Sequence, residues 1–326
     1  MQVLLTGGTG FLGNNLLRML LESGYGVTAT TRHSSDPRPF DGLTIETLPI
    51  DLKEPNLVSS AVKDVDLVIH SAAMIHLGWT RQDEARRFNV EATRLLAQAA
   101  RRKKIRMIHV STVDALAASQ DGEPCDESDL TPPKPLCSYV ASKRQAEEAV
   151  LEEVDAGLDG VIVNPGFMVG PWDWKPSSGQ MMMAIAKGAG LFAPRGGCTV
   201  VDVRDVACGI LSAIQHARRG ERYILGGENL TYRELWSQMA EVVGKRPPIS
   251  LTPRWANWAA GRTGDLWGRM TGKEPSFINS ANTTMGSLIH WYRSDKAELE
   301  LGYQNGSVED GLIDAWQWFQ QHGYKP

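Results

Sequence analysis

The sequence predicts an α/β protein in which a doubly wound parallel sheet is followed by a smaller, mostly helical C-terminal domain. Three observations predict this fold. Short β-rich runs alternate with helical patterns through the first half, a glycine-rich turn follows the first run, and tryptophan is concentrated in the second half. Strands and helices that alternate at this length form right-handed crossovers, so the sheet should be parallel and covered on both faces.

The expected strands read as nearly continuous apolar runs, as a sheet buried on both faces requires. They lie at 2–6, 26–30, 43–48, 67–70, 107–111 and 161–164. Helical periodicity predicts helices between them, at 11–23, 54–63, 83–103 and 138–156. Later segments at 199–217 and 222–225 resemble this part of the chain. We therefore expect a first domain from 1–165 plus about 199–225 and a substrate domain from about 166–198 plus 226–326.

Composition excludes several classes of protein. With 326 residues, 42% of them hydrophobic, the chain can bury a large core without disulfides. Its four cysteines form no CxxC pair, so we expect reduced thiols and no metal. The formal net charge is −4, and no long basic stretch predicts nucleic acid or membrane as a partner. Neither a spanning segment nor a signal-peptide pattern is evident, so we expect a cytoplasmic protein with a small-molecule substrate.

A glycine-rich turn lies between the first predicted strand and the first predicted helix. Its sequence is Thr6-Gly7-Gly8-Thr9-Gly10-Phe11-Leu12-Gly13. Glycine permits positive φ and lets a pyrophosphate approach the backbone, while the helix N-terminus adds free amides. In this context the pattern predicts a Rossmann-type dinucleotide site, and a tight turn without ligand is the alternative. The expected cofactor contacts are Gly7, Gly10, Phe11, Leu12 and Gly13.

Cofactor choice depends on the residues that follow the second predicted strand. NAD sites usually carry an acid there, whereas this chain has Arg32 and no acid before Asp36. A guanidinium can pair with an adenosine 2′-phosphate, so Arg32 favours NADP over NAD, and a solvated strand-end charge is the alternative. The ends of the next two strands supply further expected cofactor contacts, which are Asp51, Leu52, Ala72 and Ala73.

Tyr139 and Lys143 stand four residues apart on a predicted helix and therefore share one face. The ordinary tyrosine pKa of about 10 is too high for a general base at neutral pH, and a nearby ammonium should lower it. Such a pair can exchange a proton with a carbonyl or alcohol oxygen. Ser111 and Thr112 end the preceding strand, where a hydroxyl can hydrogen-bond the reacting oxygen.

In their order along the chain, these motifs resemble the extended short-chain dehydrogenase/reductases, also described as the NAD-dependent epimerase/dehydratase family. The resemblance covers nearly the whole chain and rests on TGGTGFLG, Asp51-Leu52, HSAA, Asn89, Ser111-Thr112, YVASK and VRDVA. It implies a catalytic set of Thr112, Tyr139 and Lys143. It also implies that Asn89 organises the site, and a surface helix position is the alternative. Further cofactor contacts implied by the resemblance are Asn89, Ser111, Tyr139, Lys143, Pro165 and Gly166.

Segment 164–171 is similar to the family branch of dihydroflavonol reductases and hydroxysteroid dehydrogenases. Phe167 and Met168 present apolar surface where nucleotide-sugar epimerases hold a diphosphate. This predicts an NADP-dependent oxidoreductase that reduces a ketone or aldehyde of a small, apolar substrate, with Tyr139 as acid/base. Candidate substrate contacts are His76, Asp114 and Phe167.

Two other functions remain open. A nucleotide-sugar epimerase or dehydratase would use the same three catalytic residues with no net turnover of the cofactor. A dinucleotide-sensing protein would bind the cofactor without catalysis. The resemblance also implies a homodimer formed through the helices that hold Asn89 and Tyr139. In the second domain, helices with hydrophobic faces are expected around Met181–Met183 and Trp255–Trp267, and such faces usually belong to a core.

Overall fold

The main sheet of the protein contains seven parallel strands in the order β10-β6-β5-β4-β1-β2-β3. The computed structural model describes residues 1–326 apart from 33, 35, 132–133, 272–273, 276–277 and 325–326. The strands are β1 (Gln2–Thr6), β2 (Gly26–Thr31), β3 (Glu46–Pro49), β4 (Leu67–His70), β5 (Arg106–Val110), β6 (Gly160–Pro165) and β10 (Arg222–Leu225). Every apolar run that was expected to form a strand does so, with small shifts at the ends.

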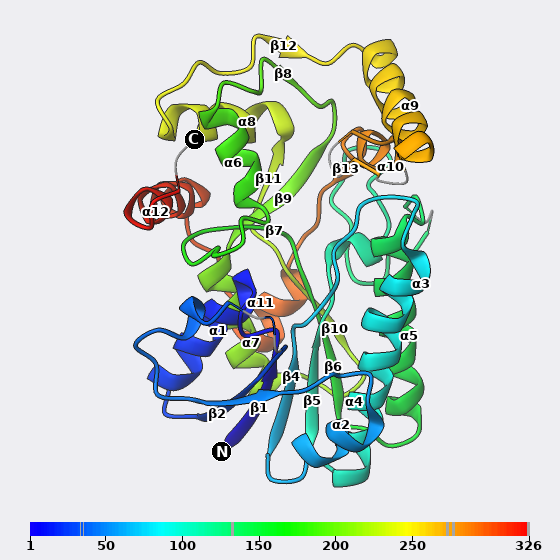
Figure 1. Ribbon diagram of the computed structural model, residues 1–326, viewed down its shortest axis with the longest axis vertical. Coiled ribbons are helices and arrows are strands. Elements are labelled where there is room, and N and C mark those ends of the chain that lie inside the picture. The colour runs from blue at the N-terminus through cyan, green and yellow to red at the C-terminus, as the bar shows by residue number, and fades with distance from the viewer. Residues whose placement is uncertain (33, 35, 132–133, 272–273, 276–277, 325–326) are drawn as a thin grey trace.

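Helices cover both faces of this sheet (Figure 1). One face is covered by α1 (Phe11–Glu22), α7 (Val203–His216) and α11 (Asp295–Leu301). The other is covered by α2 (Pro55–Ala61), α4 (Ala92–Lys103) and α5 (Ser138–Asp155). The predicted helix at 83–103 consists of three consecutive segments, which are α3 (Gln82–Ala85), the π-helical turn η2 (Arg86–Glu91) and α4. Two short 3₁₀ turns are η1 (Arg38–Phe40) and η3 (Val113–Ala115).

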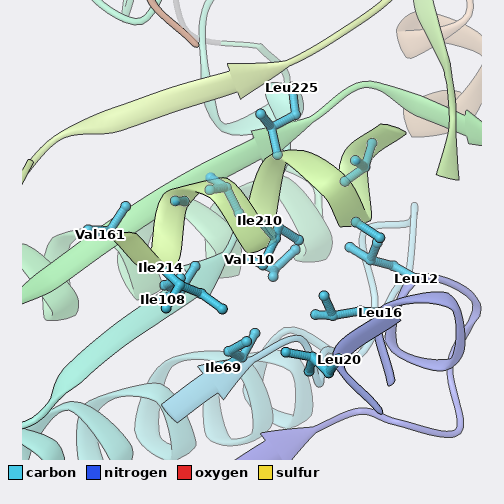
Figure 2. Close-up of a cluster of buried hydrophobic side chains, with 14 of the residues drawn as sticks. Leu12, Leu16, Leu20, Ile69, Ile108, Val110, Val161, Ile210, Ile214 and Leu225 are labelled. Carbon is cyan, nitrogen blue, oxygen red and sulfur yellow. The ribbon is translucent and has the colours of Figure 1, made fainter. Parts of the chain in front are cut away.

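Strand β1 shows why both faces are covered. Val3 and Leu5 pack into a cluster built largely from α1 and α7, whereas Leu4 packs into a second cluster with α2, α4 and α5. Figure 2 shows the first cluster, in which Leu16 of α1 and Ile210 of α7 lie among side chains from the strands. Burying one such side chain is worth roughly 1.5–3 kcal/mol. The α1–α7 layer therefore holds the N-terminus of α1 firmly at the end of β1.

Within the described residues, the smaller region contains two short sheets and five helices. Its four-stranded sheet is made of β7 (Phe167–Val169), β9 (Gly197–Asp202), β11 (Glu228–Thr231) and β13 (Ile289–His290). A two-stranded sheet pairs β8 (Phe192–Ala193) with β12 (Ser250–Leu251). The helices are α6 (Gly179–Ala186), α8 (Tyr232–Val242), α9 (Arg254–Thr271), α10 (Ser280–Met285) and α12 (Val308–Gln321). The carboxyl ends of the main-sheet strands point toward this region (Figure 1).

Segment 199–217 differs in part from its expected place. Its strand β9 pairs with β7, β11 and β13 in the smaller sheet, whereas its helix α7 packs against α1 on the main sheet. An apolar strand followed by an amphipathic helix looks locally like one more βα unit. The hydrogen-bond partners of β9, which are distant in the sequence, decide to which sheet the strand belongs.

The large apolar residues of the smaller region divide into two groups. Met182 is buried in its core, as expected, and Trp318 is buried there as well. Trp255, Trp258 and Trp267 of α9 are exposed, so the expectation that this helix buries its hydrophobic face is wrong. Among the helices of the described residues, none is both long enough and apolar enough to cross a membrane.

Candidate active site

The glycine-rich turn lies at the point where the strand order of the main sheet reverses, beside β1 and β4. Open parallel sheets bind ligands at this point. Gly7 has a φ of +79°, and a Cβ on it would lie 2.7 Å from the backbone nitrogen of Ala72. A Cβ on Gly13 would overlap the Gly7 carbonyl oxygen. The turn is therefore closed to side chains at both positions and keeps backbone alone at its surface.

Helix α1 begins directly after this turn. Gly10 is its N-cap in an extended conformation, and its first three residues are Phe11, Leu12 and Gly13. The first amides of a helix have no acceptor within the helix, and they carry a partial positive charge. The Leu12 side chain is buried in the core, so only its backbone can face a ligand. These features fit the pyrophosphate of a dinucleotide.

Arg32 comes directly after β2 and is exposed. Asp36, the first acid after it, accepts hydrogen bonds from the Arg38 guanidinium at 2.9 and 2.6 Å. These bonds hold the pKa of Asp36 below its ordinary value. The first acid after β2 is thus engaged by Arg38, and the exposed Arg32 is the first charged residue after that strand.

Asp51 and Leu52, the expected cofactor contacts that would face the adenine base, differ in how much surface they offer. Asp51 is exposed and accepts a hydrogen bond from the Lys53 backbone at 3.0 Å. Leu52 is buried in the second core cluster, with α2 and α4. The structure therefore leaves little of the Leu52 side chain for packing on a base.

Small residues line the ends of β4, β5 and β6. Ala72 and Ala73 follow β4 and are half-buried, and Pro165 ends β6. A Cβ on Gly166 would lie 2.7 Å from the Thr199 carbonyl oxygen. Ser111 is buried, and its hydroxyl has no hydrogen-bond partner among the described residues. Because an unpaired buried hydroxyl is costly, a polar ligand group at this edge would be stabilising, and NAD(P) fits that requirement.

Thr112, Tyr139 and Lys143 are brought together at the end of β5. Tyr139 and Lys143 lie on α5, and Thr112 follows β5 by two residues. The Lys143 ammonium is buried and donates a hydrogen bond to the Val110 carbonyl oxygen at 2.7 Å. The Tyr139 phenol is within hydrogen-bonding reach of the Thr112 side chain. A hydroxyl, a phenol and an ammonium therefore gather at the carboxyl end of β5, the same edge of the sheet as the glycine-rich turn.

The pKa of Tyr139 is raised well above its ordinary value. Burial is the main cause, the Asp114 carboxylate adds to it, and the hydrogen bond with Thr112 opposes it. The expected net lowering of this pKa is therefore not seen in the protein by itself, and an effect of Lys143 on the phenolate stays a prediction. Burial lowers the pKa of Lys143 to about 8, with the Glu147 carboxylate opposing. Tyr139 thus keeps its proton at neutral pH, which is the form that can protonate a carbonyl oxygen.

A buried network behind the candidate catalytic residues was missed from the sequence. Glu147 accepts hydrogen bonds from Asn164 at 2.7 Å and from Arg222 at 2.8 Å. Asn164 also donates to the Thr112 carbonyl oxygen at 2.9 Å. The network ties α5 to β6, β10 and the backbone of Thr112. The available signal was the position of Glu147, which lies four residues after Lys143 and so on the same face of the helix.

Asn89 is buried inside the π-helical turn η2, so its alternative placement on the surface is wrong. Its side-chain nitrogen donates to the Met74 carbonyl oxygen at 2.9 Å and to the Ser142 hydroxyl at 2.8 Å. Its oxygen accepts from the Met74 backbone at 2.7 Å. Both ends of the amide are thus used to join the segment after β4 to α5. π-Helical turns of this kind often occur at functional sites.

Asp114, a candidate substrate contact, belongs to a charged cluster that the sequence analysis also missed. Its carboxylate lies 2.9 Å from the buried Lys134 ammonium and 3.4 Å from Nδ1 of His290. Burial acts to raise the pKa of Asp114, but Lys134 and His290 together hold it well below its usual range. Asp114 therefore places a stable negative charge near Tyr139. Lys134 lies in a loop and His290 in strand β13, and both are distant from Asp114 in the sequence, so no local pattern indicates them.

The other two candidate substrate contacts differ from Asp114. Nε2 of His76 lies 3.1 Å from the Thr80 hydroxyl and 3.1 Å from the Glu274 carboxylate, so this ring is engaged within the chain. Phe167 begins β7 and is half-buried, directly after Gly166 at the end of the main sheet. Phe167 therefore follows directly on the strand β6 that ends at the candidate active site, and part of its side chain is accessible.

The fold and the site together define a class of protein, namely NAD(P)-binding enzymes of the oxidoreductase and epimerase type. The model of the NAD dependent epimerase/dehydratase family matches residues 3–226, so the chain belongs to this family. The predicted fold class and the resemblance to extended short-chain dehydrogenase/reductases are confirmed. Within the described residues, no group of three or more His, Cys, Asp or Glu side chains could hold a metal ion.

Individual relatives extend this assignment over the whole chain. A Synechocystis protein named putative dihydroflavonol 4-reductase is 35% identical, over 98% of this chain and 94% of its own. Sterol demethylase protein B of Methylococcus capsulatus is 32% identical over 99% of both chains. The crystal structure of gox2253 superposes with a TM-score of 0.86 at 33% identity, over 99% of both chains.

Proposed function

We propose that this protein is an NADP-dependent reductase that converts a ketone or aldehyde of an apolar substrate to an alcohol. The observation that carries the proposal is Tyr139, which keeps its proton beside the Thr112 hydroxyl at the end of β5. A phenol in its acid form is suited to donating a proton to a carbonyl oxygen. The dinucleotide turn lies at the same edge of the sheet.

Each side chain has a distinct part in this reaction. A bound reduced nicotinamide would supply the hydride that adds to the carbonyl carbon. Thr112 donates a hydrogen bond that orients the carbonyl oxygen, and Tyr139 transfers its phenolic proton to that oxygen as the alcohol forms. The Lys143 ammonium, held by the Val110 carbonyl, stabilises the phenolate left on Tyr139 until solvent returns a proton.

The preference for NADP is supported by the charges that follow β2. Arg32 stands where a carboxylate would repel a 2′-phosphate, and the nearest acid, Asp36, is engaged by Arg38. Replacing Arg32 with Asp should raise the KM for NADPH by about tenfold or more, since a charge-assisted pair is replaced by a repulsion. The KM for NADH should change by less than about twofold. Equal effects on both cofactors would contradict the NADP preference.

An apolar substrate is supported by the residues after β6 and by the names of the relatives. Phe167 and Met168 are half-buried at this position and offer no charge to a diphosphate. Arg195 is a cation that could serve a sugar-nucleotide phosphate. Its guanidinium instead donates a hydrogen bond to the Thr252 carbonyl oxygen at 3.0 Å. Two relatives are named for a dihydroflavonol and a sterol, which are both polycyclic compounds without a phosphate.

The proposal is tested with a panel of aromatic and alicyclic ketones and aldehydes, supplied with NADPH or NADH. We expect loss of reduced nicotinamide equal to the alcohol formed. Tyr139→Phe should lower kcat by about 10³-fold, because the proton donor is lost, while the Kd for NADPH changes by less than about twofold. Full activity in Tyr139→Phe would exclude this mechanism.

An epimerase or dehydratase is the second candidate, because the matched family is named for those reactions. The same Thr112, Tyr139 and Lys143 would serve it. The distinguishing result is a changed sugar, supplied as UDP-glucose or dTDP-glucose, with no net change in the cofactor. Binding of NADPH without turnover on either panel would instead indicate a dinucleotide-sensing protein.

A further inference from the structure

Helix α9 presents large apolar side chains to solvent and small residues to the protein. Gly261 and Gly264 are buried against α10, and a Cβ on Gly264 would overlap the Ile278 carbonyl oxygen. The exposed fractions of its large residues are 75% for Trp255, 66% for Trp258, 58% for Leu266, 61% for Trp267 and 77% for Met270. An ordinary surface helix has the reverse distribution. Figure 1 shows α9 at the outer edge of the smaller region.

These exposed residues form one continuous stripe. Trp255, Trp258, Arg262, Leu266 and Arg269 follow one another at intervals of three and four residues, so their side chains stack along one face. We call these five residues, with Trp267 and Met270 beside them, the α9 stripe. Single exposed apolar residues are common, but a row of them is typical of a surface that contacts something else.

The exposed charged residues of α9 are all positive. Its exposed cations are Arg254, Arg262 and Arg269. Its one acid, Asp265, is half-buried and accepts a hydrogen bond from the Ser280 backbone at 2.9 Å. The Arg262 guanidinium lies 5.9 Å from the centre of the Trp258 ring, so cation and aromatic ring share the same surface. The outer face of α9 is therefore both aromatic and basic.

Tryptophan and arginine on one exposed helix face match the boundary of a lipid bilayer. Indole rings favour the headgroup level, and guanidinium groups pair with anionic lipid phosphates. A second copy of this chain would bring arginines against arginines if the two stripes met face to face. We propose that α9 docks the protein on the surface of an anionic lipid bilayer. This proposal revises the expectation of no membrane partner, which rested on the net charge of the whole chain.

The segment that follows α9 contacts the loop that leads to the candidate active site. Glu274 accepts hydrogen bonds from the Trp79 and Thr80 backbones, each at 3.0 Å. Three residues before Trp79, the His76 carbonyl oxygen accepts a hydrogen bond from the Tyr139 backbone at 3.2 Å. Docking through α9 would thus hold the start of α5 close to the bilayer, from which an apolar substrate could reach Tyr139. That consequence rests on the proposed reductase function, whereas the docking does not.

Co-sedimentation with large vesicles tests the proposal on the full chain. We expect binding to vesicles of equal parts phosphatidylcholine and phosphatidylglycerol to be about tenfold or more stronger than binding to phosphatidylcholine alone. Trp255→Ser with Trp258→Ser, and separately Arg262→Gln with Arg269→Gln, should each weaken binding to the anionic vesicles by about tenfold. The matched control is Leu299→Ser on α11, which removes an apolar side chain that is 85% exposed and lies outside the stripe. This variant should bind vesicles like the wild type.

Other outcomes overturn the proposal. No binding of the wild type to anionic vesicles would do so, as would equal binding by all variants. A wild-type dimer that dissociates in Trp255→Ser with Trp258→Ser, without vesicle binding, would identify a second copy as the occupant. Because the replaced residues are exposed, each variant should keep the wild-type unfolding midpoint. Tyr139→Phe should bind vesicles normally, which separates this test from that of the proposed function.

Discussion

Helices α5 and α9 are each 18 residues long, and each departs from the usual distribution of side chains at particular positions. Helix α5 buries Lys143 and Glu147, whereas α9 exposes Trp255 and Trp258. The buried charges of α5 have partners in the chain, as in the hydrogen bond from Lys143 to the Val110 carbonyl. The exposed rings of α9 face solvent. Buried charges that have partners within the chain can position a reactive group. Large apolar rings that stay exposed are instead typical of a surface that contacts another molecule.

The first of the two largest expected effects concerns the inner face of α9. Gly264→Ala adds a methyl group where the Ile278 carbonyl oxygen stands, so α9 must move away from α10. We expect the free energy of unfolding to fall by about 3 kcal/mol, measured by urea denaturation. Thr263→Ala, on the exposed side of the same turn, is the control and should change it by less than about 0.5 kcal/mol. An unchanged free energy of unfolding in Gly264→Ala would mean that α9 does not pack closely on α10.

The next prediction breaks the inner face of α5. Glu147→Ala removes the acceptor of Asn164 and Arg222 and leaves both without their buried partner. The free energy of unfolding should fall by about 3 kcal/mol, since breaking a buried pair on one side exposes the full cost of burial. Glu148→Ala, at the exposed neighbouring position, should cost less than about 0.5 kcal/mol. Similar values for the two variants would show that the network contributes little to stability.

A pH series sharpens the account of α5. Burial lowers the pKa of Lys143 from 10.5 to about 8, so between these values the unfolded chain binds more protons than the folded one. The free energy of unfolding contributed by Lys143 is therefore lowest below pH 8 and rises with pH through that window. Relative to Lys143→Met, the wild type should gain on the order of 2 kcal/mol between pH 8 and pH 10.5. A constant difference in urea denaturation across the series would contradict the lowered pKa.

The smallest expected effect concerns the outer face of α9. Trp258→Ala removes a ring that is mostly exposed, so the free energy of unfolding should change by less than about 0.5 kcal/mol. Trp318→Ala supplies the contrast, because that ring is buried in the core of the smaller region and its loss should cost about 3 kcal/mol. Thermal or urea denaturation of both variants measures the difference. A large loss in Trp258→Ala would place its ring in a core and remove the basis of the α9 stripe.

Much of the candidate site could be predicted because its signals are local. Gly7 and Gly13 are required by close backbone contacts within a single strand–turn–helix unit. Tyr139 and Lys143 share a face because four residues make about one turn of a helix. Apolar runs predicted the strands of the main sheet, since a doubly covered strand must be apolar along its whole length. These features follow from the sequence by itself.

Only the tertiary structure decided the features that depend on distant partners. The sheet to which β9 belongs depends on β7, β11 and β13, and the charge of Asp114 depends on Lys134 and His290. The raised pKa of Tyr139 depends on burial, which no spacing of residues expresses. The pattern of α9 predicted an amphipathic helix, but the expectation that its hydrophobic face would be buried was wrong. The buried glycines against α10 decide that its tryptophans face solvent, because only residues without side chains fit between the two helices.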